Sequence, residues 1–576
     1  MSRHTPAPPN PDELNARTAS DLAAEAGRWA LVSVLDPGYA LPTAVAAGDD
    51  EAPPDRAPVA LLRDGLASGQ VEGLDALARL SARDELGALL HDPEMQRPAR
   101  LAWLLRHGAD PDSRDARGDT LVFSLMSRGP AAVPALVSVL ARGVSPAGAG
   151  GLARFMAACA ADDQAARTLE SFALDLLERG ADPFAPSPQG DPALSLAVRL
   201  GWQRLLDRLL DIGVDREARD SHGMTALHLA AVLGRETALK QLIAKGASPD
   251  ARAADGQTPL GVALACGRRD LADWLDWRTW SLPRRALRAS DLPAAAMAGD
   301  RDAVRRLLDL GFDVDSPDAQ GCTALLRASG GGFGSTVDLL LARGADPQRA
   351  ATTGATPLSA AVSMRQADIV GALLAAGADI EHRLPGGVTV LMLAAALGLP
   401  EIVARLITAG ANVHAGDAQG LTPLHCAALY GFTAREKPRL VALLDTLLLS
   451  GAESEQVAAG AVTPLLLLLG ARAEPGTACD EEVVLAGLER LLDEGVSLDV
   501  QDPRGFGPLH LASLHGLLRV VSRLLRAGAD PELRDTLNRT PREIAVMRGF
   551  IDVAAEFVPV APGAGASMAR FLRDRG

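Results

Sequence analysis

The sequence predicts an all-α fold, a solenoid of stacked helix-turn-helix units joined by turn-rich finger loops. The chain has 576 residues, more than one hydrophobic core ordinarily organises. Hydrophobic residues make up 48% of it and aromatic residues 3%, so Ala, Leu and Val dominate, which suits closely packed helices. A marker position recurs along most of the chain, and a stack of small copied units accounts for all three observations.

The recurring position, which we call the slot, sets the period. Nine of the thirteen intervals between successive slots are 33 residues long. The slots are Gly87, Thr120, Ala153, Pro192, Thr225, Thr258, Ser290, Thr323, Thr356, Thr389, Thr422, Thr463, Gly507 and Thr540. Self-similarity of this kind indicates a repeat architecture.

Each unit repeats the same order of residue types. Leu stands two places after most slots, Ala five places after, and Gly often nine places after. A Leu pair then precedes a second Gly, which lies twelve residues before the next slot. The apolar spacing predicts two short helices, the second ended by a left-handed Gly, and the residues after that Gly are rich in Asp, Pro and Gly as in tight turns. Neither helix is long enough to be stable alone, so stacking must bury their apolar faces.

The TPLHCAA stretch at 422–428, the GAD ending of many units and the 33-residue period resemble those of ankyrin repeats. The similarity is closest over residues 223–250, 354–380 and 420–428, and it extends over roughly 57–556. This resemblance implies an ankyrin-repeat solenoid of about fourteen repeats, with paired antiparallel helices and β-hairpin fingers. We divide it into a first sub-array at 57–280 and a second at 281–556.

Polar residues that could be taken for catalytic or metal-binding groups occupy places that the repeat explains. The position of His228, three after the slot, holds His425 and His510 but also Leu, Phe, Met, Ser and Gly in other units, a range that no catalytic or metal role tolerates. Cys426 beside His425 also occupies a repeat position, and the glycine run at 330–334 lacks the Lys of a phosphate-binding loop. We therefore expect no catalytic residue, no metal site, no cofactor and no enzyme activity.

Composition narrows the partner and the compartment. A formal net charge of −15 disfavours nucleic acid or an anionic membrane as the main partner. Five cysteines without metal-ligand spacing suit a reducing compartment. No signal peptide or membrane span is recognisable, and only three of the 57 basic residues are Lys, as in a GC-rich bacterial gene. We expect a cytoplasmic protein, with a secreted effector as the alternative.

Residues 1–56 do not follow the period. The segment 14–35 is predicted to be an amphipathic helix with Leu22, Ala26, Trp29 and Val32 near one face. It either caps the first repeat or tethers the array to a partner region.

The first departure within the array is Arg278, which stands where most units have the second Gly. A bulky residue is disfavoured in a left-handed position, so this finger should be remodelled, with a short helix from Pro283. Trp274 fills a core position. An aromatic-basic patch remains, and it is either a partner site, since Trp and Arg are enriched at binding hot spots, or a joint between the two sub-arrays. Its residues are Trp277, Trp280, Arg284, Arg285 and Arg288.

The second departure consists of two longer intervals, of 41 and 44 residues. They predict loops at 431–438 and 471–480 that emerge side by side and carry Phe432, Arg435, Lys437 and Arg472 as candidate partner contacts. Exposed loops that merely tolerate insertion are the alternative. Residues 557–576 are expected to form a mobile tail.

The predicted function follows from the predicted shape. An extended concave surface suits a non-enzymatic scaffold that binds a protein partner. The alternatives are a regulator or inhibitor of a specific enzyme, or a secreted effector acting on a host protein. We expect a monomer, with a dimer as the alternative.

Overall fold

The structure is a computed structural model that describes residues 18–38, 57–69, 74–162 and 166–558. The chain divides into two units. Unit 1 comprises Met1–Trp277 with Leu282–Leu287, and unit 2 comprises Arg278–Ser281 with Arg288–Gly576. The predicted sub-array boundary at 280/281 stays a prediction. Helices make up the regular structure of both units, as the all-α solenoid prediction requires.

Unit 1 begins with helices that precede the regular pairs. Its helices are α1 (Ala19–Glu25), α2 (Trp29–Leu35), α4 (Pro58–Ser68), α5 (Asp75–Leu80), α6 (Arg83–Leu89), α7 (Pro98–Arg106), α8 (Leu121–Met126), η2 (Gly129–Ala132), α9 (Val133–Leu140), α10 (Gly151–Ala161), α11 (Arg167–Glu178), α12 (Ala193–Leu200), α13 (Gln203–Ile212), α14 (Ala226–Val232), α15 (Glu236–Ala244), α16 (Pro259–Ala265) and α17 (Arg269–Leu275).

Unit 2 consists of consecutive helix pairs. They are α18 (Asp291–Met297), α19 (Arg301–Asp309), α20 (Ala324–Gly331), α21 (Gly334–Ala342), α22 (Pro357–Ser363), α23 (Ala367–Ala375), η3 (Pro385–Gly387), α24 (Val390–Ala396), α25 (Pro400–Thr408), α26 (Pro423–Thr433), α27 (Lys437–Leu449), α28 (Pro464–Leu468), α29 (Glu481–Asp493), α30 (Pro508–His515), α31 (Leu518–Arg526), α32 (Pro541–Met547) and α33 (Ile551–Ala555).

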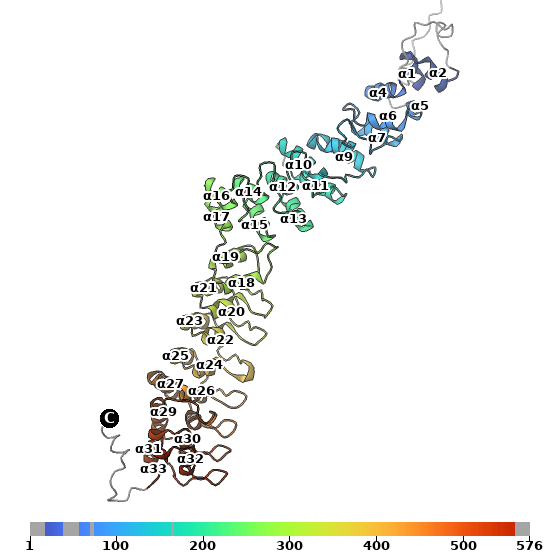
Figure 1. The fold of residues 1–576 in the computed structure, drawn as a ribbon. Coiled ribbons are helices and arrows are strands. Elements are labelled where there is room, and N and C mark those ends of the chain that lie inside the picture. Colours follow the sequence, from blue (N-terminus) through green and yellow to red (C-terminus); the bar gives the residue numbers. More distant parts are fainter. Residues whose placement is uncertain (1–17, 39–56, 70–73, 163–165, 559–576) are drawn as a thin grey trace, which may run out of the picture. The chain divides into compact units, whose positions relative to one another are not determined.

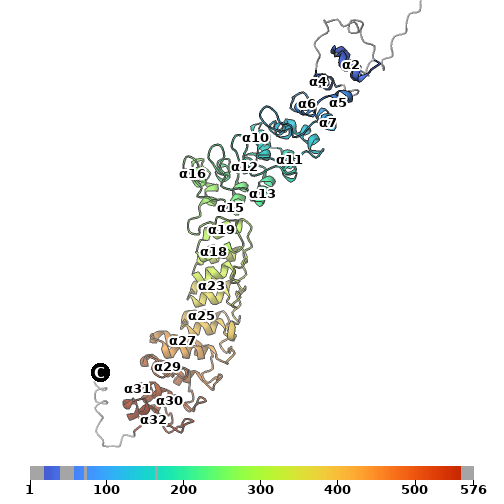
Figure 2. The same cartoon turned by 45° about the vertical axis from the view of Figure 1, so that its right-hand side comes forward.

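The helix pairs of unit 2 form two columns. We call the helix that follows a slot the first helix of its pair and the other the second helix. First helices α18, α20, α22, α24 and α26 pack on one another in order, and second helices α19, α21, α23, α25 and α27 form the neighbouring column (Figures 1 and 2). The finger loops project beyond the first helices, on the side away from the second helices (Figure 1).

The slot residue starts the first helix. Thr323 is the N-cap of α20, and its side-chain oxygen accepts the backbone N–H of Leu326 at 3.3 Å. Such a bond satisfies one of the free N–H groups at a helix start. Pro follows the slot in several units, where its missing N–H costs no hydrogen bond, as in Pro357 and Pro541.

The core lies between the two columns. Leu two places after the slot and Ala five places after it are inaccessible to solvent, for example Leu325, Ala328, Leu358 and Ala361, each 0% exposed. The small Ala side chains allow neighbouring first helices to approach closely. The packing predicted from the repeat is therefore present.

The fingers are tighter than the expected β-hairpins. Isolated bridges occur at Arg114–Thr120, Arg219–Thr225 and Ala458–Val462, and the described residues contain no β-strand. In most fingers the N–H five residues before the slot donates to the carbonyl one residue before it, as from Asp318 to Cys322 at 3.0 Å. Three residues separate the two bonded positions, so the finger closes before a longer ladder can form.

Two expected helices differ in the structure. The single helix predicted at 14–35 is two helices, because Gly27 adopts a left-handed φ of 70° between α1 and α2. Residues 14–17 lie outside the described residues. Helix α1 contacts α4 and α5 of the array, and its capping role stays a proposal.

The short helix predicted from Pro283 is wrong. Residues 276–290 are all described, and none of them is helical. The N–H of Leu287 donates to the carbonyl of Ala244 at 2.8 Å, and the N–H of Arg288 donates to the Asp291 carboxylate at 2.8 Å. These bonds replace the bonds that a helix would have made.

The first inserted loop is also smaller than predicted. Helices α26 and α27 are 11 and 13 residues long, and residues 434–436 alone stay irregular between them. The inserted residues lengthen the helices because the apolar spacing of 440–448 continues a helical face. Residues 471–480 form an irregular connection, as predicted, before the 13-residue α29. In the described part of the chain no helix has the length and apolar composition needed to cross a membrane.

Candidate protein-binding surface

In three units a histidine three places after the slot ties the first helix to the next finger. His228 accepts the N–H of Thr225 on Nδ1 at 3.3 Å, and its Nε2 lies 3.0 Å from the carbonyl oxygen of Gln257. Because a backbone N–H can only donate, Nδ1 is the acceptor, so Nε2 carries the proton and donates to the carbonyl. His425 and His510 repeat this arrangement.

Burial governs the charge of these histidines. His228, His425 and His510 are each 0% exposed, and burial lowers the pKa of all three below the usual value of 6.5. They are therefore neutral at pH 7 and hold the scaffold that presents the surface.

An Asp five places before the slot shapes the finger tip. Asp318 accepts the N–H groups of Gln320 and Cys322 on one oxygen, at 2.8 and 3.0 Å. Its other oxygen pairs with Arg327 at 2.6 Å. Asp220, Asp417, Asp502 and Asp535 make the same pair of backbone bonds. Each of these five fingers is thus held by hydrogen bonds to its own Asp side chain.

Neighbouring fingers of unit 2 are also linked to one another. Backbone bonds join consecutive tips, as from Thr352 N–H to the Gln320 carbonyl at 3.3 Å and from Ala418 N–H to the Gly386 carbonyl at 2.8 Å. A carboxylate at the base of one finger accepts an N–H of the next, as Glu381 does from Asn412 at 2.8 Å. A preorganised row of this kind lowers the entropy cost of binding.

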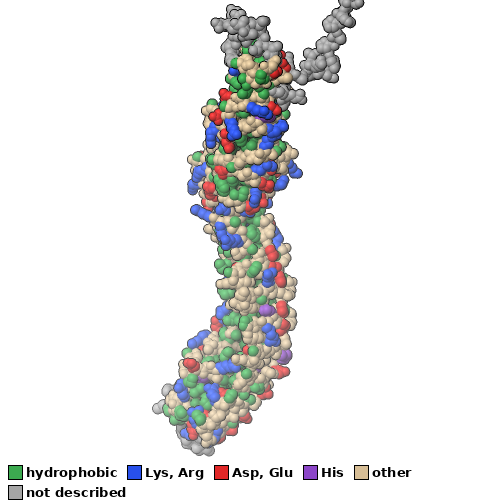
Figure 3. All heavy atoms as spheres, turned by 90° about the vertical axis from the view of Figure 1, so that its right-hand side faces the viewer, with side chains coloured by type: hydrophobic (Ala, Val, Ile, Leu, Met, Phe, Trp, Pro, Cys, Tyr) green, Lys and Arg blue, Asp and Glu red, His purple; other side chains and the backbone are tan. Residues whose placement is uncertain are grey.

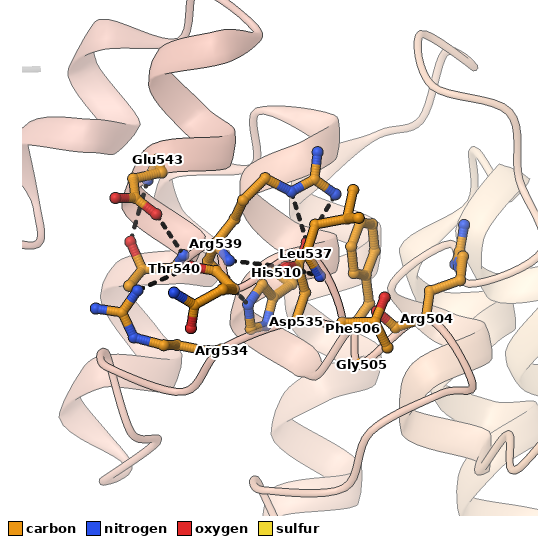
Figure 4. A network of polar contacts seen from close by, with 12 residues as sticks. Arg504, Gly505, Phe506, His510, Arg534, Asp535, Leu537, Arg539, Thr540 and Glu543 are labelled. Carbon is orange, nitrogen blue, oxygen red and sulfur yellow. Dashed lines mark hydrogen bonds and ion pairs between the residues drawn. The ribbon is translucent and has the colours of Figure 1, made fainter.

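The last two fingers surround an aromatic ring with charge (Figure 4). The guanidinium groups of Arg504 and Arg539 lie 4.7 and 5.9 Å from the centre of the Phe506 ring, and the His510 ring stacks on it at 5.7 Å. Arg539 pairs with the fully buried Asp535 carboxylate at 2.7 Å. Burial alone would raise the pKa of Asp535, but the hydrogen bonds from Arg539 outweigh it and hold that pKa below its usual range.

Exposed apolar side chains gather at the ends of the first helices. In unit 2 we call Met297, Met364 and Leu429 the first-helix stripe, and their exposed fractions are 59%, 57% and 40%. Each lies seven or eight places after its slot, so the repeat sets them along one face of the column. In unit 1 Val232 and Leu233 lie seven and eight places after Thr225 and are also exposed.

Charge is scarce on this column of unit 2. Helices α20, α22, α24 and α26 contain one charged side chain, Arg327, whose guanidinium is already paired with Asp318. The second helices α21, α23, α25 and α27 all carry charged residues. On the face in Figure 3, acidic side chains lie along one edge of unit 2, and hydrophobic side chains are scattered over the rest of the face. The first-helix column therefore suits an apolar contact.

The aromatic-basic patch predicted around Arg278 is not brought together within either unit. Trp277, Arg284 and Arg285 belong to unit 1, whereas Trp280 and Arg288 belong to unit 2. Trp277 is buried, and its ring N–H donates to the Trp274 carbonyl at 2.7 Å.

The other four members of the patch are more accessible. Trp280 and Arg285 are half-buried, and Arg284 and Arg288 are exposed. Partner contacts by these residues stay a prediction.

The residues predicted at the insertions also differ in accessibility. Phe432 is 2% exposed and its ring lies 4.8 Å from the His515 ring, which corrects its expected place in an exposed loop. Arg435, Lys437 and Arg472 are exposed, and Arg472 donates to the Gln419 side chain at 3.0 Å. Their contact with a partner stays a prediction.

Sequence reasoning missed the first-helix stripe. The signal was available, because positions seven and eight after the slot hold Met297, Met364 and Leu429 where a solvated helix end would hold polar residues. These residues fit the helical pattern, so nothing in the repeat marks them as exceptional.

Reactive groups do not assemble elsewhere in the described residues. No group of three His, Cys, Asp or Glu side chains there could hold a metal ion. Burial raises the pKa of the Cys159 and Cys426 thiols to about 12, so both stay protonated. The glycine run at 330–334 ends α20 and starts α21, with Gly332 left-handed at φ 76°.

Comparison with known proteins finds two kinds of similarity. Models of ankyrin repeats match residues 155–253, 194–276, 292–384 and 491–545, and a model of the single ankyrin repeat matches 386–418. Together these ranges include more than half of the chain. Protein phosphatase 1 regulatory subunit 27 of Mus musculus is 44% identical over 59 residues, which are 10% of this chain and 38% of that protein. The chain thus aligns with less than half of that relative.

Proposed function

This chain belongs to the ankyrin-repeat family, and from that premise we propose that it is a non-enzymatic scaffold that binds a protein partner through the first-helix stripe of unit 2. The observation that carries the proposal is the exposure of Met297, Met364 and Leu429 on a column whose helices hold almost no charge. The finger row beside it is fixed by its own hydrogen bonds.

The proposed contact has an apolar centre. Large apolar side chains at similar places on every second unit, on α18, α22 and α26, offer a partner several anchors along one line, and hot spots of this kind dominate affinity. The side chains around them are small, as in Ser363 and Ala396, which leaves room for protruding groups of the partner. Arg327 is paired with Asp318 of its own repeat, so the contact needs no acidic group from the partner to balance its charge.

A pair of substitutions tests this surface. Met364→Glu with Leu429→Glu places two charges on the stripe, and Leu449→Glu is the control because Leu449 is 89% exposed at the end of a second helix. The partner is captured from source cells, identified by mass spectrometry and purified. We expect Kd to rise roughly tenfold or more for the double variant and to stay unchanged for the control. Equal Kd values for all three proteins would refute the surface.

A second candidate is a regulator or inhibitor of an enzyme. The observation that favours it is the similarity to a phosphatase regulatory subunit over 59 residues. Adding the purified chain to protein phosphatase 1 should then change its rate on a phosphopeptide in a saturable manner. If the phosphatase rate is unchanged when this chain is present at about tens of micromolar, the regulator hypothesis is rejected and the scaffold hypothesis remains.

We also propose that the protein functions in a reducing compartment. All five cysteines are free in the structure, and Cys159 is a fully buried thiol that oxidation would force out of the core. These free thiols support our proposal that the protein is cytoplasmic, with a secreted effector as the alternative. Immunoblots of cells and of culture medium distinguish the two.

A further inference from the structure

The last two fingers of unit 2 carry guanidinium groups whose counter-charges lie inside the protein. Arg504 pairs with Asp502 at 2.6 Å, and Arg539 pairs with Asp535 at 2.7 Å. The two Arg side chains are 49% and 28% exposed, whereas the two Asp side chains are 3% and 0% exposed. Each carboxylate is therefore covered, and the part of each pair that meets solvent is cationic.

Arg472 adds a third guanidinium group beside these fingers. It belongs to the connection after α28, and it donates to the Gln419 side chain at 3.0 Å and to the Ala459 carbonyl at 3.4 Å. Both acceptors are neutral, and Arg472 forms no ion pair within the described part of the chain. Arg504 donates to the carbonyl of Ala471 at 3.0 Å, which brings its finger tip next to Arg472.

We call Arg472, Arg504 and Arg539 the guanidinium row. The last two of them both lie over the ring of Phe506 (Figure 4). An apolar side chain accompanies the row, because Leu537 is 68% exposed at the tip of the last finger. That tip is joined to the Arg504 carbonyl by the preceding backbone N–H at 3.1 Å. The surface therefore combines exposed cations with one exposed leucine.

The carboxylates near the row do little to neutralise it from outside. Three of them accept backbone N–H groups of their own turns or helix starts, namely Asp417, Asp480 and Glu543. Glu474 is exposed in the same connection as Arg472, but it forms no ion pair with a described residue. At the base of the last finger Glu532 and Arg534 are both exposed and opposite in sign. The row thus keeps an excess of exposed positive charge at the tips.

We propose that the guanidinium row binds an acidic segment of a protein partner. A guanidinium group and a carboxylate are both planar, so they can form two parallel charge-assisted hydrogen bonds. Arg is also among the residues that most often dominate binding energy at an interface. Leu537 favours a segment in which an apolar residue accompanies the carboxylates.

A protein segment suits this surface better than a nucleic acid. The chain has a formal net charge of −15, so a long phosphate backbone would be repelled beyond the short row. The row starts at Gln419, three residues before the slot of α26, the helix that carries Leu429 of the first-helix stripe. The inference deepens the proposed function by giving the chemistry of one partner segment, and its contacts lie outside the stripe, so either can fail alone.

The first test compares two matched double variants of the full chain. Arg472→Gln with Leu537→Gln removes a cation and a leucine from the row, and Arg526→Gln with Leu449→Gln removes the same groups from exposed ends of second helices. The probe is a fluorescein-labelled peptide with the repeating sequence Glu-Leu-Asp-Glu, followed by fluorescence anisotropy. We expect saturable binding below about 1 mM, with Kd raised roughly tenfold in the first variant alone. No saturable binding to the unaltered chain, or equal Kd values in the two variants, would overturn the proposal.

The second test changes the probe. A peptide with the repeating sequence Gln-Leu-Asn-Gln should bind roughly tenfold more weakly, and Kd for the acidic peptide should rise when NaCl is raised from about 50 to about 300 mM. An equal Kd for the neutral peptide would contradict an acidic ligand. Tighter binding of a thymidine oligonucleotide of equal length, lost in Arg472→Gln with Leu537→Gln, would make a nucleic acid the ligand and would also contradict the proposal.

A further variant separates this inference from the proposed function. Met364→Glu changes the first-helix stripe two units before the row, so Kd for the acidic peptide should stay unchanged whatever happens to capture of the partner. A rise in Kd as large as that in Arg472→Gln with Leu537→Gln would place the peptide on the stripe and overturn the row as its site.

Discussion

Glycine at the end of a first helix is a requirement of the backbone, and Arg365 shows what happens without it. Most units have Gly nine places after the slot with a left-handed φ, as in Gly398 at 65°. Arg365 occupies that place at φ 61°. A side chain in this conformation is strained because its Cβ crowds the backbone.

Arg365→Gly should therefore stabilise the protein. The relief of strain exceeds the entropy that Gly adds to the unfolded chain, and we expect a gain of about 1 kcal/mol in the free energy of unfolding of the segments around α22. Urea titration followed by hydrogen exchange measures it. Gly398→Ala is the opposite control, since the new Cβ would meet the Tyr430 ring. A loss of stability in Arg365→Gly would contradict the strain.

For single residues, the sequence predicted the structural role well at places that recur from repeat to repeat, and less well at places where one unit departs from the others. The buried histidines and the left-handed glycines followed from comparing equivalent places. The burial of Trp277 and Phe432 did not, because both lie where the structure departs from the repeat, in the irregular segment 276–290 and in the lengthened α26. Their accessibility depends on neighbours that the local sequence does not contain.

First helices and fingers are coupled by the histidine bridges, which gives the array a pH dependence. Protonation of Nδ1 in His228, His425 or His510 would remove the acceptor for the N–H at the slot. Their folded pKa values are lowered, so the unfolded chain binds more protons between the two pKa values. The contribution is therefore present above pH 6.5 and is lost as the pH falls below it.

We expect the urea midpoint to fall between pH 7 and pH 5, where most carboxylates are still ionised. His510→Gln should flatten this dependence, because Gln does not titrate. His414→Gln is the control, since His414 is exposed in a finger. If the urea midpoint falls equally steeply with pH in the unaltered chain and in His510→Gln, the histidine bridge does not titrate between pH 7 and pH 5.

The positions of the helices were predictable where the 33-residue period holds. Where the interval is longer, the predicted positions were wrong. Slots such as Thr356 and Thr422 are the N-caps of their helices. The inserted residues after Thr422 lengthen α26 and α27, because the repeat states where helices start but not how far an apolar face continues. The fingers lack strands because three residues between bonded positions leave no length for a ladder.

Each helix pair contacts its sequence neighbours, so damage to one pair should remain local. Leu358 is 0% exposed in α22, which packs on α20 and α24. Leu358→Ala should cost about 3 kcal/mol by leaving a cavity. Stability in a stack is a sum over nearest neighbours, so hydrogen exchange should rise in α20 to α25 and stay unchanged in α30 to α32. A uniform rise across unit 2 would indicate one cooperative core instead.

For the whole molecule, the fold class followed from the period, but the binding surface did not. The period predicted stacked helix pairs because they are the way to bury Leu and Ala that recur at helical spacing. It could not single out Met364 or Leu429, since binding residues occupy places that the stack leaves free. Their exposure became known from the arrangement of the helices.

The most direct test of a scaffold acting through its first helices is the footprint of the bound partner. Hydrogen exchange is measured for the chain alone and for its complex with the captured and purified partner. Protection should appear in peptides from α22, α24 and α26 and in the finger tips beside them. Protection confined to the second helices α21, α23, α25 and α27, with the first helices unchanged, would contradict the account.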